Sequence, residues 1–269
     1  MHKKQKEKNK NPVPSKMYDS EYYEKYNHGY DEFVKDKSLM PDLEAKVSQI
    51  NFKNKKVLDA ACGRGEFVRY AALKGAEATG FDYSPSAIKI CNDMIKDLDK
   101  KTKSKISFDV MDIKELGYGD NEFDLVVMFD IIEHLHHWEL KKTMHEIHRV
   151  LKPGGEIYVH TSPNKIMMDL VRKVTRPFGV TLKSEEFHVN EITYKSMLDY
   201  TQYFEGKVML EKDKNYWSKQ MVFRGSFLKG VAKVLDLFVD FYPIHKLMSI
   251  KPFSVVTATD IWFLGKKPL

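Results

Sequence analysis

The residues Val57-Leu58-Asp59-Ala60-Ala61-Cys62-Gly63-Arg64-Gly65 form the most informative stretch of this 269-residue sequence. An apolar run that ends in an acid and continues into Gly-x-Gly is typical of a buried strand, a glycine turn and a helix start. Because glycine lacks a Cβ atom, the backbone of such a turn can approach a ligand closely, and the free N–H groups of the helix point toward it. The stretch therefore predicts a site for a nucleotide-sized cofactor.

The neighbouring side chains indicate which kind of nucleotide fits. Val68 occupies the place where a dinucleotide fingerprint requires a third small residue, and Asp59 lies four residues before Gly63. A pyrophosphate would be repelled by the Asp59 carboxylate, whereas a cationic amino group would be attracted to it. The pattern therefore favours a cofactor with an amino group over a dinucleotide.

Three segments further along also read as strands that lead into an acid. They are Glu77–Asp82, with Asp82 placed 17 residues beyond Gly65, Ile106–Met111 followed by Asp112, and Phe123–Phe129 followed by Asp130. The last of these is an apolar run that suits the centre of a parallel sheet. A carboxylate at the end of the second strand can accept hydrogen bonds from both hydroxyls of a ribose.

In their order and spacing these segments resemble motif I and the following motifs of the class I S-adenosylmethionine (SAM)-dependent methyltransferases, over roughly residues 55–165. The resemblance implies an α/β, Rossmann-like fold with a seven-stranded, mostly parallel sheet and helices on both faces. It also implies SAM as cofactor and S-adenosylhomocysteine (SAH) as product. The cofactor-binding residues that follow from the resemblance are Asp59, Ala60, Gly63, Gly65, Asp82, Tyr83, Met111, Asp112 and Phe129.

The resemblance assigns the ribose to Asp82, the adenine face to Tyr83 and the adenine amino group to Asp112. A structural alternative stays open for two of the acids, since Asp59 could only cap its turn and Asp82 could only support the next helix start. Cys62 and Cys91 are expected to be small buried apolar residues, because their spacing fits no zinc pattern.

The segment after the fourth strand supplies the catalytic candidates. If it is helical, Asp130, Glu133 and His134 lie on one face. His134 is the expected general base, because the ordinary pKa of histidine lies near the operating pH. The segment resembles the Glu-x-x-Glu-His by which ubiquinone-biosynthesis O-methyltransferases and small-RNA 3′-end 2′-O-methyltransferases bind a divalent ion. Here the first acid is the shorter Asp130, so no metal is expected and these three residues are only weak metal candidates.

Candidate residues for the acceptor come from three places in the chain: His188, Asn164, Tyr22 and Tyr26. His188 lies about where the RNA enzymes place a further histidine ligand, and a role in the substrate pocket is expected for it here. The two tyrosines belong to N-terminal helices that either cover the cofactor as a lid or simply pack against the sheet.

Composition and charge set the domain boundaries. Residues 1–16 carry six lysines and one glutamate, hence five of the six net positive charges, and are expected to form a disordered tail. Lid helices at 17–50 and a methyltransferase domain at 51–269 follow, with an insertion at about 213–255. Two cysteines and the absence of an apolar leader favour the cytoplasm.

The insertion contains an apolar helical stripe between Phe227 and Tyr242, with lysines on its other side. It is expected to cap the active site or form a subunit contact. The alternative is peripheral contact with the inner face of the membrane, where a lipid-linked acceptor would be found.

Further elements are expected at 140–151 (helix), 156–161 (strand), 193–204 (helix), 207–211 (strand) and 257–264 (strand), and the Pro153-Gly154-Gly155 turn ends the first of these helices. The expected function is methyl transfer from SAM to a small-molecule acceptor, on a hydroxyl of a quinol, phenol, sugar or lipid-linked intermediate. Two alternatives remain: an RNA 2′-O-methyltransferase with a divalent metal, although no appended RNA module is recognisable, and a non-catalytic SAM-binding module.

Overall fold

The computed structural model describes residues 11–25, 30–162, 164–175, 187–212 and 253–269, together with Lys233, Leu237, Phe241, Leu247, Met248 and Ile250. Tyr26 and most of the expected insertion, including the greater part of its apolar stripe, lie outside these residues. The predictions for them stay predictions. Among the helices of the described part, none is long and apolar enough to cross a membrane.

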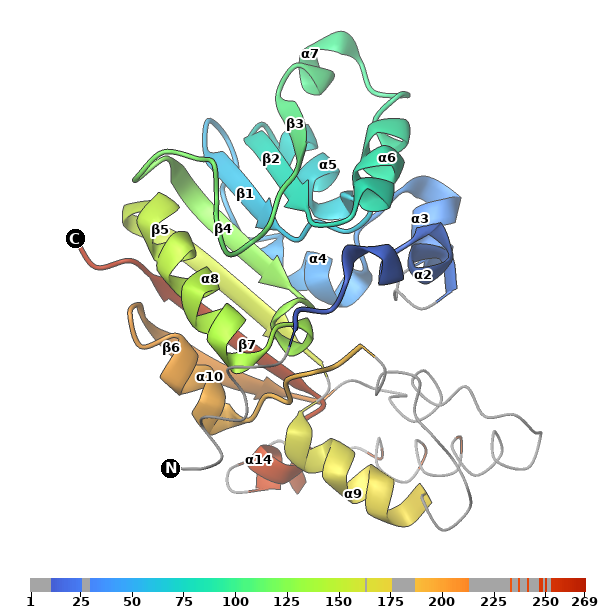
Figure 1. Ribbon diagram of the computed structural model, residues 1–269, viewed down its shortest axis with the longest axis vertical. Coiled ribbons are helices and arrows are strands. Elements are labelled where there is room, and N and C mark those ends of the chain that lie inside the picture. The colour runs from blue at the N-terminus through green and yellow to red at the C-terminus, as the bar shows by residue number, and fades with distance from the viewer. Residues whose placement is uncertain are drawn as a thin grey trace.

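A seven-stranded sheet forms the centre of the fold, with strand order β3-β2-β1-β4-β5-β7-β6 (Figure 1). Neighbouring strands from β3 to β5 pair in parallel, whereas β7 runs antiparallel to both β5 and β6. This confirms the predicted α/β, Rossmann-like sheet. The strands are β1 Lys56–Ala60, β2 Glu77–Asp82, β3 Ile106–Val110, β4 Phe123–Phe129, β5 Leu151–Thr161, β6 Glu205–Glu211 and β7 Asp260–Lys266.

Helices cover both faces of the sheet. The described helices are η1 Ser15–Met17, α2 Ser20–Lys25, α3 Tyr30–Asp36, α4 Pro41–Val47, α5 Glu66–Leu73, α6 Pro85–Met94, α7 Lys100–Lys103, η2 Ile132–His134, α8 His137–Val150, α9 Lys165–Thr175, α10 Tyr194–Tyr200 and α14 Phe253–Thr257. Two buried apolar clusters hold the layers together, one containing side chains of α8 and α10 and the other those of α4, α5 and α6. Each large aliphatic side chain buried in them stabilises the fold by about 1.5–3 kcal/mol.

The glycine turn after β1 has the predicted form. Gly65 adopts a φ of 83° directly before α5, and a Cβ atom there would lie 2.9 Å from Cys91 Sγ. Glycine is therefore required at this position both by the backbone and by the packing. The next helix, α6, begins as predicted, because the Ser84 side chain accepts a hydrogen bond from Ala87 N and Pro85 occupies the first turn.

Several element boundaries differ from the prediction, and three of the differences have a clear structural reason. Helix α8 begins at His137, because the backbone N–H of His136 donates to Glu139 Oε2 (3.0 Å) and caps the helix earlier than the apolar periodicity suggests. Strand β5 begins at Leu151, which pairs with Phe123. The Pro153-Gly154-Gly155 stretch lies within this strand, where the register between β4 and β5 shifts. Strand β7 begins only at Asp260, since α14 takes the preceding residues.

The N-terminal segment lies over the carboxyl ends of the parallel strands rather than away from the domain. Tyr83 donates its hydroxyl hydrogen to Val13 O (3.4 Å), and His136 Nε2 donates to Asn11 O (3.1 Å). Residues 11–16 therefore belong to the folded body, unlike the tail predicted for 1–16, because backbone carbonyls there find donors on the domain. Residues 1–10 lie outside the described part.

Candidate active site

Asp82 organises the glycine turn at the end of β2. Its carboxylate accepts hydrogen bonds from Gly63 N (Oδ2, 3.0 Å) and Ser84 N (Oδ1, 2.8 Å). Burial raises the pKa of Asp82 to about 6, although these hydrogen bonds oppose the rise. The predicted ribose acid and the predicted glycine turn thus form one structural unit.

The N-terminal helix α2 is attached to the same unit. Tyr23 donates from its hydroxyl to Asp82 Oδ1 (3.3 Å), and the Tyr23 carbonyl accepts from Arg64 Nη1 (2.9 Å). Arg64 is buried and forms an ion pair with Glu66 at 2.7 Å. Sequence analysis missed Tyr23 and Arg64, although Arg64 stands between the two glycines of the turn and could have been considered.

Asp59 lies buried in β1, close to two further acids. Burial, and then the carboxylates of Glu66 and Asp82, raise the pKa of Asp59 well above its ordinary value. A group of acids beneath a ligand-binding turn stabilises a cation placed among them. These acidic surroundings suit the cationic amino group expected at Asp59.

The predicted adenine end lies at the ends of β2 and β3. Tyr83 is half-buried. Asp112 accepts from the backbone N–H of Lys114 (2.9 Å), and Lys114 Nζ also pairs with the Asp112 carboxylate at 3.0 Å and with Glu139 at 2.9 Å. Any adenine amino group would therefore share the Asp112 carboxylate with Lys114.

Three other predicted cofactor residues lie at strand ends on the same edge. Ala60 is the fully buried last residue of β1, and Met111 follows β3 directly. Phe129 ends β4 and packs edge-on against Phe67 and Trp262, at centroid distances of 5.4 and 5.8 Å. Their positions are those expected for the SAM edge, while their contacts with a cofactor stay predictions.

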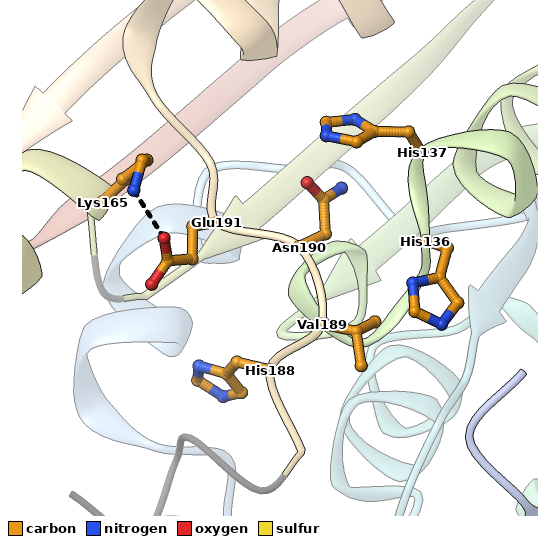
Figure 2. A pocket seen from close by; sticks show the side chains of 7 residues that line it. All are labelled: His136, His137, Lys165, His188, Val189, Asn190 and Glu191. Carbon is orange, nitrogen blue, oxygen red and sulfur yellow. Dashed lines mark hydrogen bonds and ion pairs between the residues drawn. The ribbon is translucent and has the colours of Figure 1, made fainter. Parts of the chain in front are cut away.

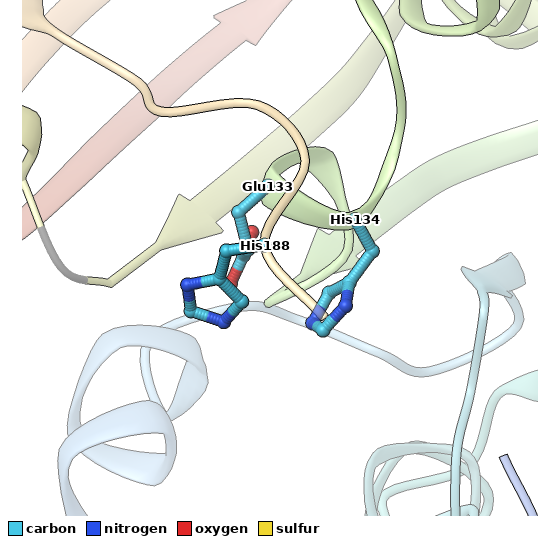
Figure 3. Close-up of side chains that lie close together, drawn as sticks. All are labelled: Glu133, His134 and His188. Carbon is cyan, nitrogen blue, oxygen red and sulfur yellow. The ribbon is translucent and has the colours of Figure 1, made fainter. Parts of the chain in front are cut away.

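Glu133, His134 and His188 meet beyond the end of β4 (Figure 3). One potential ligand atom from each lies within 4.8 Å of the other two. The loop that carries His188 is attached by its backbone, since Val189 N and Asn190 N both donate to Glu133 O at 3.0 Å. We call these three residues the Glu133 cluster.

The cluster differs from the predicted Asp130–Glu133–His134 set. The segment is not an α-helix but a single 3-10 turn that begins at Ile132, and Asp130 precedes it with a φ of 52°. The Asp130 carboxylate instead lies 2.9 Å from His160 Nδ1. Asp130 is therefore not grouped with Glu133 and His134, and the third group of the cluster is His188.

The donor set of the Glu133 cluster suits a divalent cation, because one carboxylate and two imidazoles are ligands that zinc, iron or manganese accept. Glu133 and His134 are also hydrogen-bonded to other side chains. Thr161 donates its hydroxyl hydrogen to Glu133 Oε2 (2.8 Å), and the Tyr18 hydroxyl is hydrogen-bonded to His134 Nδ1 at 3.2 Å.

The cluster residues have strongly shifted pKa values. Burial, and then the neighbouring His188, lower the pKa of His134 to about 3, so its imidazole is neutral at ordinary pH. It can accept a proton but holds it more weakly than the sequence analysis supposed. Burial and the nearby Asp130 raise the pKa of Glu133.

A buried charge network, absent from the sequence-based candidates, lies beside this cluster. His160 of β5 lies 2.9 Å from Asp130 and 3.4 Å from Asp260, and its ring packs on Trp262 at a centroid distance of 4.4 Å. Burial alone would lower the pKa of His160, but the two aspartates outweigh it and raise the pKa to about 10. A protonated imidazole therefore compensates the charge of Asp130.

The predicted acceptor residues separate into two groups. Tyr22 packs edge-on against Tyr18, whose ring lies 5.8 Å from His134, so the tyrosine lid reaches the Glu133 cluster. Asn164 does not, because it is fully buried and its amide donates to Val255 O (3.0 Å), which fastens α9 to α14.

A small cavity of about 260 Å³ opens on one side of His188 (Figure 2). Six of its seven lining residues are polar. They are His136, His137, Lys165, His188, Asn190 and Glu191, with Val189 as the apolar member. Only His188 among them was a predicted substrate residue.

Comparison with known proteins identifies the central domain. Residues 57–155 match the family model of a methyltransferase domain, and they contain the glycine turn, Asp82 and the Glu133-His134 pair. Over these residues the chain carries a methyltransferase domain, as the resemblance to the class I SAM-dependent family predicted. Its seven-stranded, mostly parallel sheet is the one that the resemblance predicted, and the site lies at the carboxyl ends of the parallel strands.

Several methyltransferases are similar to this domain in sequence. Tocopherol O-methyltransferase of Arabidopsis thaliana is 38% identical over 110 residues, which are 40% of this chain and 30% of that protein. Norajmaline N-methyltransferase of Rauvolfia serpentina is 36% identical over 135 residues (50% and 42%). Ubiquinone biosynthesis O-methyltransferase of Coxiella burnetii is 30% identical over 113 residues (42% and 46%). The match thus spans less than half of these curated relatives.

Solved structures share the fold over a longer stretch. A SAM-dependent methyltransferase from Methanosarcina mazei has a TM-score of 0.59 at 20% identity and covers 86% of this chain and 99% of its own. Geranyl diphosphate C-methyltransferase from Streptomyces coelicolor, solved with SAH, has a TM-score of 0.58 at 14% identity and covers 92% and 82%. At these identities the likeness shows the fold alone.

Proposed function

We propose that this protein transfers the methyl group of SAM to a hydroxyl group of a small-molecule acceptor. One observation carries the proposal: the Asp82–Gly63 unit and the Glu133 cluster lie on the same carboxyl edge of the sheet, and residues 11–23 contact both of them. A cofactor held at the first can present its methyl group to an acceptor at the second. The O- and N-methyltransferase relatives support a small acceptor.

The chemistry asked of the protein is limited. SAM supplies an electrophilic methyl group on a sulfonium, so the protein has to align the acceptor oxygen with the methyl carbon and exclude water. An O–CH₃ bond then forms, the S–CH₃ bond breaks to leave SAH, and the hydroxyl proton passes to the Glu133–His134 pair. Both side chains are buried, which keeps competing water away from them.

The acidic surroundings of this edge support a cationic cofactor. Asp59 and Asp82 group at the glycine turn, whereas the charge of Glu66 is compensated by Arg64 and that of Asp130 by His160. The positive sulfonium of SAM is stabilised by such a field. The thioether sulfur of SAH is uncharged, so it is stabilised less. This difference would assist product release.

A calorimetric titration followed by a turnover assay tests the proposal. We expect both SAM and SAH to bind, SAM the more tightly, and methyl transfer from radiolabelled SAM to occur with at least one member of a panel of quinols, phenols, glycosides and cyclitols. Binding without transfer to any of them would support a non-catalytic SAM-binding module. No binding of either nucleoside would overturn the proposal.

The Glu133 cluster favours one second candidate, an RNA 2′-O-methyltransferase that uses a divalent ion. Glu133, His134 and His188 would hold the ion, which would polarise a ribose hydroxyl. A short single-stranded RNA with a free 3′ end, assayed with Mn²⁺ and without it, separates this candidate from the first. Metal-dependent methylation of the RNA would favour the second.

A further inference from the structure

The cavity beside His188 has a lining that is unusual for a small-molecule site. Such sites are lined mostly by apolar and aromatic side chains and measure roughly 300–1,000 Å³. This cavity holds about 260 Å³, space for a single ring, and Val189 is the one aliphatic residue among the described residues that line it. Within the described part of the chain, an aromatic quinol or phenol ring would find few of the apolar walls that usually hold it.

Asn190 supplies a hydrogen-bond acceptor in this lining. Its side-chain Nδ2 donates to Ile132 O at 3.5 Å, which orients the amide because a carbonyl can only accept. The Asn190 Oδ1 atom is buried and accepts no hydrogen bond from the part of the chain that the structure describes. In Figure 2 the amide points away from its own backbone, toward the side on which His137 lies. A buried acceptor without a partner costs stability, so a ligand that donates there is favoured.

The charges around the cavity compensate one another. Lys165 pairs with Glu191 at 2.6 Å and with Asp169 at 3.0 Å, and Arg172 pairs with both of these acids. Two cations thus face two carboxylates. A phosphate or an ammonium group in the cavity would have to disrupt this network, whereas a neutral hydroxyl-rich ligand would not.

The cavity also adjoins the Glu133 cluster through one shared residue. His188 belongs to both, and the backbone N–H groups of Val189 and Asn190 hold their loop on the Glu133 carbonyl at 3.0 Å. A ring seated beside His188 in this cavity would therefore lie next to the Glu133 cluster.

We infer that this cavity binds a neutral, polyhydroxylated ring, of the kind found in a glycoside or a cyclitol, as the methyl acceptor. This inference rests on the proposed function, since it names the acceptor class of that site. Such an acceptor differs from a quinol or phenol because it donates hydrogen bonds to Asn190 and needs no apolar wall. A lipid chain on the far side of such a ring is compatible with it.

Saturation-transfer NMR on the SAH-loaded protein tests the inference. The probes are methyl β-D-glucopyranoside and myo-inositol, with glucose 6-phosphate as the charged probe and 4-hydroxybenzyl alcohol as the phenol. We expect saturation of the two neutral polyols, weaker saturation of the phosphate and none of the phenol. If the phenol or the phosphate binds more tightly than both polyols, or if neither polyol binds, the inference is overturned.

Two variants locate the binding. Asn190→Leu removes the unpartnered acceptor, and His137→Phe keeps the ring that stacks on Tyr200 but removes its nitrogens. Each should weaken polyol binding by about 3- to 10-fold, the effect of one neutral hydrogen bond, while SAH affinity stays within twofold. Asn92→Leu, on the exposed side of α6, is the matched control and should change neither.

If Asn190→Leu does not fold, His137→Phe still decides the question. Unchanged polyol binding in His137→Phe would place the ligand elsewhere and overturn the inference. Failure of SAH to bind the wild-type protein would instead overturn the proposed function, so the two failures are distinguishable.

Discussion

The Tyr23 hydroxyl donates to Asp82 Oδ1 at 3.3 Å, so the acid expected to hold the ribose of SAM also holds the N-terminal helix. The same carboxylate receives the backbone N–H of Gly63 at its other oxygen. Cofactor binding and helix docking therefore depend on one side chain, and their contributions can be separated by mutation.

Asp82→Ala should weaken SAH binding strongly, because each hydrogen bond from a ribose hydroxyl to the charged carboxylate contributes about 1.5–3 kcal/mol. Tyr23→Phe is the matched control, since it removes only the contact of the helix with Asp82, and SAH affinity should stay within about threefold. Isothermal titration of SAH measures both variants. Equal affinity of Asp82→Ala and the wild type would contradict the ribose assignment.

The raised pKa of Asp82 adds a pH dependence to this prediction. Since burial raises the pKa of Asp82 to about 6 in the ligand-free protein, the carboxyl group is largely protonated at pH 5 and ionised at pH 7. Ribose hydroxyls bond better to the ionised form, so SAH affinity should rise as pH rises through about 6. Asp82→Asn should lose this rise.

His134→Ala should lower turnover by roughly 10²-fold or more with little change in SAM affinity, as expected for loss of a proton acceptor. Because the pKa of His134 is lowered to about 3, its imidazole stays neutral above pH 5, and no loss of rate near pH 6.5 should arise from it. A kcat profile of the wild type measures this. Near-normal turnover of the variant would leave His134 with a structural role.

Turnover of the wild type should survive EDTA. Glu133 already accepts from Thr161 and His134 is hydrogen-bonded to Tyr18, so the pair is oriented by the protein itself. Activity assayed before and after chelation, with metal content measured by mass spectrometry, checks this. Loss of activity that Mn²⁺ or Zn²⁺ restores would show that the cluster works as a metal site.

His160 should make stability dependent on alkaline pH. Asp130 and Asp260 outweigh the effect of burial and raise its pKa from 6.5 to about 10. The stabilisation is therefore complete below pH 6.5 and is lost as pH rises through 10. The thermal midpoint of the wild type should fall between pH 7 and 10, and that of His160→Gln should fall less. Each kcal/mol of stabilisation lost by the wild type corresponds to about 2–4 °C. If the midpoints of the two proteins fall in parallel, the ion-pair network is falsified.

The sequence predicted the parts of the site that depend on short-range patterns. Gly63, Gly65 and Asp82 follow from strand, turn and helix periodicity, and the structure confirms where they lie. The pairing of His160 with Asp130 was not predictable in this way, because it needs the ends of β4, β5 and the antiparallel β7 to be side by side. His188 was indicated by the resemblance alone, and its place in the Glu133 cluster depends on another long-range contact, because Val189 N and Asn190 N hold its loop on Glu133 O.

The segment of residues 11–23 connects the two ends of the site by contacts at Asp82, Ser84, His134 and His136. We expect a nucleoside bound at Asp82 to lie beside this segment, so exchange of SAH for SAM should be coupled to the breaking of some of these contacts. Shortening the N-terminal end of the chain is accordingly expected to accelerate product release while loosening the hold on the cofactor.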